Sequence, residues 1–104
     1  MNINDYQKAA EATAIYPQEY ARTYPILGLV GEAGELANKW KKVLRDDKPV
    51  DVDDLADELG DVLWYVALIA TDLGFSLDEV ATININKLRS RKERGVLGGS
   101  GDKR

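Results

Sequence analysis

The chain has 104 residues, of which 44% are hydrophobic and 31% are charged, a composition typical of one small folded domain. It contains no cysteine and no histidine, which excludes disulfides, Cys/His zinc sites and every catalytic triad that needs an imidazole. A metal ion here must therefore be held by oxygen ligands, which favours Mg²⁺, Mn²⁺ or Ca²⁺.

The net charge of −4 is unevenly distributed along the chain. Residues 1–84 carry 7 basic and 16 acidic side chains, whereas residues 85–104 carry 7 basic and 2 acidic ones. An acidic body with a basic end can hold both a cation and an anion, although a solvated basic terminus is the simpler interpretation. The longest apolar run, residues 62–70, is too short to span a membrane, and no signal-peptide pattern is seen, so we expect a cytoplasmic protein.

Helical patterns dominate and strand patterns are scarce, which predicts an all-α, antiparallel four-helix-bundle-like domain. The first helix is expected over about residues 3–15, and Pro17 and Pro25 bracket a connection or short helix. A second helix is expected over about residues 26–45, because apolar residues recur there in steps of three and four. The residues on that face are Leu27, Val30, Ala33, Ala37, Trp40 and Leu44.

The third and fourth helices have clear start and stop signals. Asp51 is a predicted N-cap, and Gly74 is expected to end the third helix after Leu73. The segment 62–70 is apolar on all sides, which favours a central position in the bundle or a subunit interface. Ser76 and Glu79 form a predicted capping box for a fourth helix that ends near residue 95. We therefore expect one domain over residues 1–95 and a glycine-rich basic tail over 96–104.

Two pairs of acidic residues stand at helical spacing in the second and third helices. Glu32 and Glu35 form one pair, and Glu58 and Asp61 form the other. If the two helices are antiparallel neighbours, four carboxylates can face one gap, and their mutual repulsion is relieved by divalent cations or by exposure to water. Acid pairs are also common on exposed helix faces, but the second pair leads directly into the apolar segment.

Basic residues form a second polar stripe. Asn84, Lys87 and Arg91 lie on one side of the fourth helix, where Lys and Arg can grip phosphate, although a solvated face is the simpler alternative. Lys39 continues the side of the second helix that carries the glutamates, and it can pair with acids or meet an anion. Carboxylates, bases and a nucleotide-sized gap indicate metal-assisted hydrolysis of a phosphoanhydride, and the absence of a Walker-type glycine loop excludes a P-loop enzyme.

The sequence resembles the MazG-like family of all-α nucleoside triphosphate pyrophosphohydrolases. The resemblance is carried by "GLVGEAGELANKWKK", "DLADELGDVLWYVALIA", "LGFSLDEVATININKLRSRKERG" and "GSGDKR". These segments contain the family pattern of ExxE on one helix and ExxD on the next. Many members have a glutamate immediately before the first motif, where this chain has Gly31.

The resemblance implies hydrolysis of a nucleoside or deoxynucleoside triphosphate to the monophosphate and pyrophosphate, by metal-activated water that attacks the α-phosphorus. It implies Mg²⁺, with Mn²⁺ as a substitute, held by Glu32, Glu35, Glu58 and Asp61, and a glutamate of the second helix that removes the proton. Substrate contacts would come from Lys39, Asn84, Lys87 and Arg91, with Lys87 and Arg91 also catalytic. The family also implies a homodimer or a homotetramer that is a dimer of dimers.

Other classes of protein fit the sequence less well. A non-enzymatic helical oligomerisation or interaction module would use the apolar third helix but leaves the Glu58 and Asp61 pair unexplained. A ferritin-like di-iron bundle needs histidine ligands. Nucleic-acid binding by the basic end is disfavoured, because aromatic residues for base stacking are nearly absent there. We expect a small nucleotide as the partner, and neither a nucleic-acid polymer nor a membrane.

Overall fold

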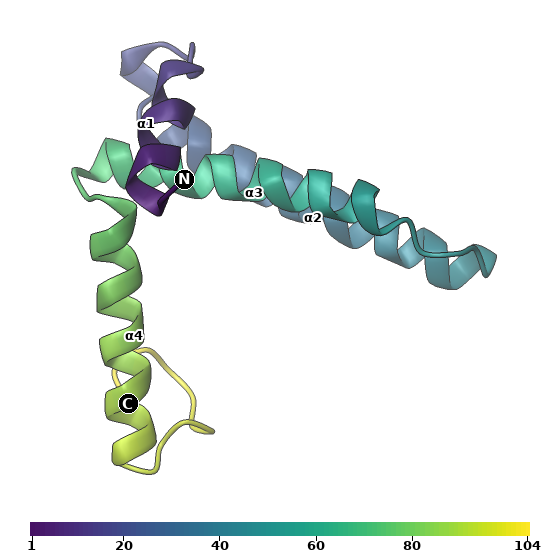
Figure 1. Cartoon of the computed structure of the whole chain (residues 1–104). Coiled ribbons are helices and arrows are strands. Elements are labelled where there is room, and N and C mark those ends of the chain that lie inside the picture. The colour runs from purple at the N-terminus through teal and green to yellow at the C-terminus, as the bar shows by residue number, and fades with distance from the viewer.

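The computed structural model describes all 104 residues and contains four α-helices and no strand (Figure 1). The helices are α1 (Ile3–Ala12), α2 (Thr23–Asp46), α3 (Val52–Leu73) and α4 (Leu77–Glu93), with a short 3-10 helix η1 (Gln18–Tyr20) between α1 and α2. The predicted all-α fold class is confirmed. None of the helices combines the length and the apolar character that crossing a membrane requires.

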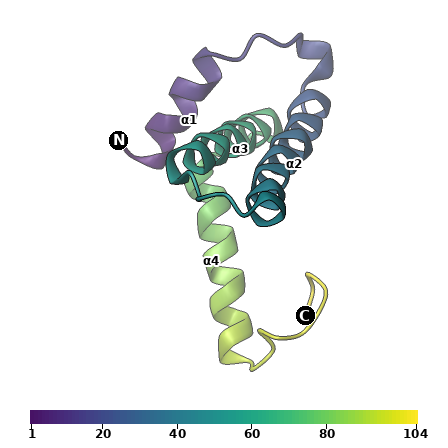
Figure 2. The same cartoon turned by 90° about the vertical axis from the view of Figure 1, so that its right-hand side faces the viewer.

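The two long helices α2 and α3 form an antiparallel pair that carries the site. Figure 2 shows the pair nearly end-on, with α1 lying against α3. The N-terminal end of α4 contacts α1 and α3, and the rest of α4 extends away from the α2–α3 pair (Figure 1). This direction of α4 decides which of the predicted site residues can meet within one chain.

The helix termini follow from short-range chemistry. Asp51 accepts a hydrogen bond from the backbone amide of Asp54, and Ser76 and Glu79 form the predicted capping box. Gly74 ends α3 in the left-handed region, with φ of 84°, as its lack of a Cβ allows. The predicted start of α2 was wrong by three residues, since the helix begins at Thr23 and holds Pro25 in its first turn, where proline is tolerated.

The core of the single chain is small. Its buried apolar residues are Ala10, Ala67, Leu68, Ala70 and Leu77, and Tyr6, Tyr16 and Trp64 pack around them. Gln7 is also buried, and it joins α1 to the corner between α3 and α4. Its side-chain amide donates to the Thr71 hydroxyl at 3.0 Å and to the Phe75 carbonyl at 2.9 Å, and its oxygen accepts from the Leu77 amide at 2.8 Å. Gln7 therefore holds the N-terminal end of α4 in place.

Replacing Gln7 with alanine is expected to lower the free energy of unfolding by about 2–3 kcal/mol, because the buried Leu77 amide and the partly buried Phe75 carbonyl lose their partners. Lys8→Ala, an exposed change on the same helix, is the matched control and is expected to leave stability unchanged. Urea unfolding followed by circular dichroism measures both. Equal midpoints for the two variants would contradict the assigned role of Gln7.

One glycine of α2 is required by close helix packing. A Cβ at Gly28 would stand 2.2 Å from the ring of Tyr65 on α3, so the two helices approach closely at this point. Gly31, Gly34 and Gly60 have open space around their positions. Close packing within this chain therefore accounts for the glycine at position 28 and not for the other three.

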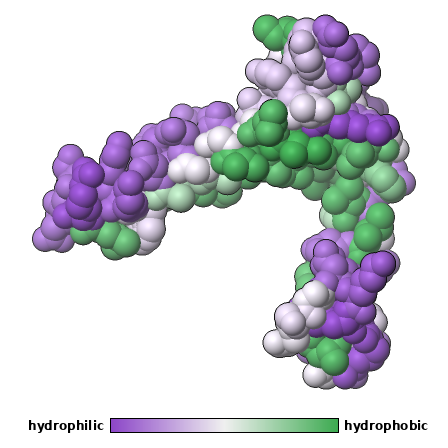
Figure 3. Space-filling model, turned by 180° about the vertical axis from the view of Figure 1, so that it is seen from behind, coloured by the Kyte–Doolittle hydropathy of each residue, from purple (hydrophilic) through white to green (hydrophobic).

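Much apolar surface stays exposed. The predicted apolar face of α2 points outward, with Leu27, Val30 and Leu44 each about two-thirds exposed and Trp40 45% exposed. On α3, Leu59 and Leu63 border an apolar groove that is also open. Figure 3 shows hydrophobic surface running along one side of the molecule toward the junction with α4. The apolar segment of α3 is therefore only partly covered by its own chain.

Candidate functional site

Three carboxylates meet between α2 and α3 and form what we call the acid cluster. Glu32 comes from α2, and Glu58 and Asp61 come from α3. One oxygen of each lies within 4.8 Å of the others. The helical spacing of Glu58 and Asp61 puts both on one side of α3, and the antiparallel neighbour brings Glu32 to face them.

The chain balances the charges in the acid cluster only in part, since Lys39 pairs with one oxygen of Glu58 and no basic side chain pairs with Glu32 or Asp61. The pKa of Glu32 is raised, first by a hydrogen bond with Glu58 and then by burial and the charges of Asp61, Glu58 and Glu35. One oxygen of Glu58, Oε2, is buried and has no hydrogen-bond partner. A buried, unpaired carboxylate oxygen is costly, and a hard cation satisfies it with the type of ligand such ions prefer. The donor set therefore fits a divalent metal ion.

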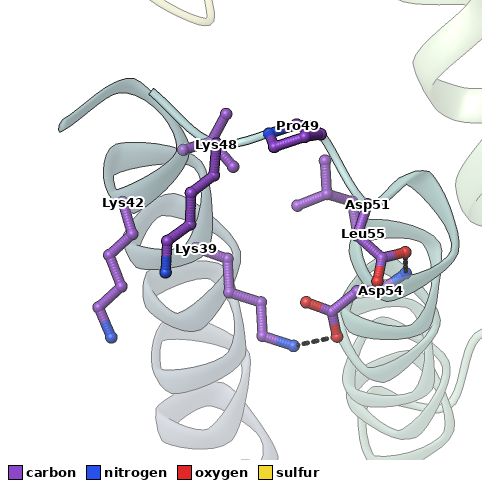
Figure 4. A pocket seen from close by; sticks show the side chains of 8 residues that line it. Lys39, Lys42, Lys48, Pro49, Asp51, Asp54 and Leu55 are labelled. Atoms are coloured by element: carbon purple, nitrogen blue, oxygen red, sulfur yellow. Dashed lines mark hydrogen bonds and ion pairs between the residues drawn. The ribbon is translucent and has the colours of Figure 1, made fainter. Parts of the chain in front are cut away.

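Lys39 is the basic residue next to the acid cluster. Its ammonium group lies 2.9 Å from Glu58 Oε1 and 2.7 Å from Asp54 Oδ1, and the second of these pairs is drawn in Figure 4. The pKa of Lys39 is raised by these two carboxylates. Lys39 was predicted to pair with acids or meet an anion from its place on α2, and the structure shows it paired with two carboxylates of α3.

Glu35 was predicted with the acid cluster but lies outside it. Its side chain is exposed beside a groove that also includes Gly31, Asn38 and Lys41. It stays close enough for its charge to contribute to the raised pKa of Glu32. Glu35 therefore borders the acid cluster and is free of the contacts that constrain Glu58.

The predicted phosphate-binding side chains of α4 lie elsewhere. Lys87 and Arg91, the basic pair, are on the part of α4 that extends away from α2 and α3 (Figure 1), and Asn84 lies exposed on the same helix. Asp102 of the C-terminal tail binds them, with its Oδ1 3.2 Å from Lys87 Nζ and 3.4 Å from Arg91 Nη2. Both basic residues lower the pKa of Asp102. The single chain does not bring the basic pair to the acid cluster.

The sequence analysis did not predict the contacts of two aspartates, Asp102 and Asp72. Asp102 lies in the glycine-rich tail, within the segment "GSGDKR" that carries part of the resemblance, and its charge, opposite to that of α4, could have indicated the pairing. Asp72, near the end of α3, accepts hydrogen bonds from the Tyr16 hydroxyl at 2.8 Å and the Arg22 amide at 2.9 Å. It therefore fixes the connection between α1 and α2 and takes no part in the acid cluster.

The chain is an all-α domain with three clustered carboxylates whose oxygens could hold a metal ion. In a comparison with protein families, the model of the MazG nucleotide pyrophosphohydrolase domain matches residues 22–96. The chain therefore belongs to this family. The match covers α2, α3 and α4, and hence the acid cluster and the basic pair. The resemblance inferred from the sequence is confirmed.

The chain is also similar to a phage protein. It is 52% identical to the Gene 37 protein of Mycobacterium phage L5 over 114 aligned positions that cover the full length of both chains. No solved structure matches the chain significantly. Family membership indicates a nucleotide pyrophosphohydrolase, a metal-dependent hydrolase that acts on a nucleotide.

Proposed function

We propose that the protein hydrolyses nucleoside or deoxynucleoside triphosphates to the monophosphate and pyrophosphate with the help of Mg²⁺. The observation that carries this proposal is the acid cluster. Glu58 belongs to the family's ExxD motif, and its Oε2 is buried without a hydrogen-bond partner. The motif supplies the reaction class, and the unbalanced carboxylates supply the reason for a metal ion. Mn²⁺ is expected to substitute, because it accepts the same oxygen ligands.

Glu32, Glu58 and Asp61 are the residues that would hold Mg²⁺. When bound, the ion would neutralise phosphate charge and make water a better nucleophile. In the reaction, the water oxygen forms a bond to the α-phosphorus, and the bond from that phosphorus to the α,β-bridging oxygen breaks. Pyrophosphate leaves with the bonding electrons, and the water proton passes to a carboxylate on α2. Glu35 suits this last role because it borders the acid cluster without belonging to it.

Glu35→Gln is expected to reduce kcat by about a hundredfold or more, the usual contribution of a general base. The variant should still gain thermal stability from Mg²⁺, because the acid cluster itself is unchanged. Steady-state kinetics and melting curves with and without Mg²⁺ measure the two effects. Loss of the Mg²⁺ stabilisation would instead assign Glu35 to the metal ligands.

The basic pair is expected to act at the acid cluster of a second chain. Lys87 and Arg91 suit phosphate, yet they lie on the part of α4 that extends away from the acid cluster of their own chain. The exposed apolar residues of α2 and α3 offer a surface for self-association. We propose a homodimer, or a tetramer built from two such dimers, in which the basic pair of one chain serves the acid cluster of another.

A substrate panel tests the proposed function. The protein is incubated with each common nucleoside and deoxynucleoside triphosphate in the presence of Mg²⁺, and the products are separated by ion-exchange chromatography. We expect a nucleoside monophosphate and pyrophosphate in equal amounts from at least one substrate. Formation of the diphosphate and orthophosphate, or no turnover of any nucleotide, would contradict the proposal.

A further inference from the structure

The C-terminal tail turns back toward α4 and contacts the basic pair (Figure 1). Oδ1 of Asp102 meets both cationic groups at once, at 3.2 Å from Lys87 Nζ and 3.4 Å from Arg91 Nη2. Arg91 also donates a hydrogen bond to the main-chain carbonyl of Asp102, and its side chain is only 5% exposed. The one carboxylate side chain of the tail therefore lies between the two side chains that the proposed function assigns to phosphate.

The tail is held in this position by a second arginine. The guanidinium group of Arg104 donates to the main-chain carbonyls of Val96, Leu97 and Gly101, at 2.9 Å for Val96 and 3.0 Å for Leu97. These hydrogen bonds close residues 96–104 into what we call the C-terminal loop. Arg104 forms no ion pair with an acidic side chain, so it determines the shape of the loop and not the charge around Asp102.

The contact between Asp102 and the basic pair is suited to exchange. Both ion-pair distances exceed the roughly 2.7–2.9 Å of a strong charge-assisted hydrogen bond, and the Asp102 side chain is 86% exposed, so water can solvate it when it leaves. Arg91 is buried while the loop is in place, so an anion from solution reaches it only when the loop moves. A phosphate oxygen is an anionic acceptor like Oδ1 and can take its position between the two cations.

We propose that Asp102 occupies the anion position of the basic pair in the free protein, and that a polyphosphate takes this position by displacing the C-terminal loop. This inference rests on the proposed function for the assignment of Lys87 and Arg91 to phosphate. A chain of phosphates carries more negative charge than one carboxylate, so it competes effectively for the two cations. Asp102 returns to the basic pair when the phosphates leave, which favours their release.

Inorganic tripolyphosphate is the probe that tests this competition, because it has the chain of phosphates without a base or sugar. The full chain is titrated in a calorimeter in metal-free buffer, so that no metal ion at the acid cluster contributes. Asp102→Asn keeps the size of the side chain and removes its charge, and it should bind tripolyphosphate about fivefold more tightly, the upper range for an exposed ion pair. Glu93→Gln is the matched control, since it neutralises an exposed acid of α4 that has no ion pair, and it should bind like the unaltered protein.

Arg104→Ala separates displacement of the loop from a simple effect of charge. The substitution removes a cation, which by charge alone weakens the binding of an anion. Because it also opens the C-terminal loop, we expect tighter binding of tripolyphosphate, by about the same factor as for Asp102→Asn. Lys103→Ala is the matched control, since it removes a neighbouring cation that has no ion pair, and it should not bind the probe more tightly than the unaltered protein.

Nuclear magnetic resonance relaxation of the backbone amides of residues 96–104 observes the displacement directly. These amides should be as rigid as those of α4 in the free protein and should become mobile when tripolyphosphate binds. A loop that stays rigid in the complex would overturn the proposal. So would equal or weaker binding by Asp102→Asn, because Asp102 would then help to hold the basic pair in place for phosphate. If no nucleotide is hydrolysed, the proposed function fails, while these measurements still decide whether Asp102 and phosphate compete.

Discussion

Asp61→Asn is expected to abolish nucleotide hydrolysis, with a loss of about a thousandfold or more in kcat/KM. Asp61 is one of three carboxylates whose oxygens lie within 4.8 Å of one another, and the amide that replaces it carries no charge to hold a divalent ion. The same change should raise the stability of the metal-free protein by about 0.5 kcal/mol, because it removes repulsion toward Glu32 and Glu58. Loss of function and gain of stability should thus come from one substitution.

Melting curves measure this pair of effects. The unaltered protein should melt at a higher temperature in millimolar Mg²⁺, because a ligand that binds the native state stabilises it, and Asp61→Asn should not respond. Asp57→Asn is the matched control, since it neutralises an exposed acid of the same helix outside the acid cluster. It should keep both the activity and the response to Mg²⁺. An Asp61→Asn variant that still hydrolyses nucleotides would contradict the assignment of the acid cluster as the catalytic metal site.

Mixed dimers of two inactive variants are expected to regain activity. One chain carries Asp61→Asn, and the other carries Lys87→Gln with Arg91→Gln, so each is inactive by itself. If the basic pair serves the acid cluster of the other chain, a mixed dimer contains one intact site and one doubly altered site. Because the two sites of a twofold dimer are equivalent, the mixed species should have about half of the unaltered activity. Co-expression with two affinity tags isolates it for the assay.

The matched control pairs Asp61→Asn with Glu58→Gln. Both changes lie in the acid cluster, so this mixture has no intact cluster in any arrangement and should stay inactive. No recovery with the basic-pair variant would mean that Lys87 and Arg91 act within their own chain or outside the site. Recovery in the control would contradict the placement of Glu58 and Asp61 in one cluster.

Helices and their termini could be predicted because they depend on neighbours in the sequence. The N-cap at Asp51, the capping box at Ser76 and the stop at Gly74 each need only three or four residues to act. The direction of α4 could not be predicted in this way. It is fixed by contacts such as that of Gln7 with the Leu77 amide, across 70 residues, and such pairings leave no periodic signal in the sequence.

The site was predictable to the extent that it lies on one pair of adjacent helices. Antiparallel α2 and α3 with acids at helical spacing bring Glu32 to Glu58 and Asp61, as expected. The position of the basic pair relative to the acid cluster depends on the course of α4 and could not be read from spacing. The pairing of Asp102 with α4 could not be predicted either, because it depends on how the C-terminal tail folds back on that helix.

In the proposed reaction, water attacks the α-phosphorus of a nucleoside triphosphate at the acid cluster. Hydrolysis in water enriched in a heavy oxygen isotope, followed by mass spectrometry of both products, tests it most directly. The heavy oxygen should appear in the nucleoside monophosphate, while pyrophosphate keeps the ordinary isotope. Heavy oxygen in pyrophosphate or in orthophosphate would show attack at another phosphorus and would overturn the proposed reaction.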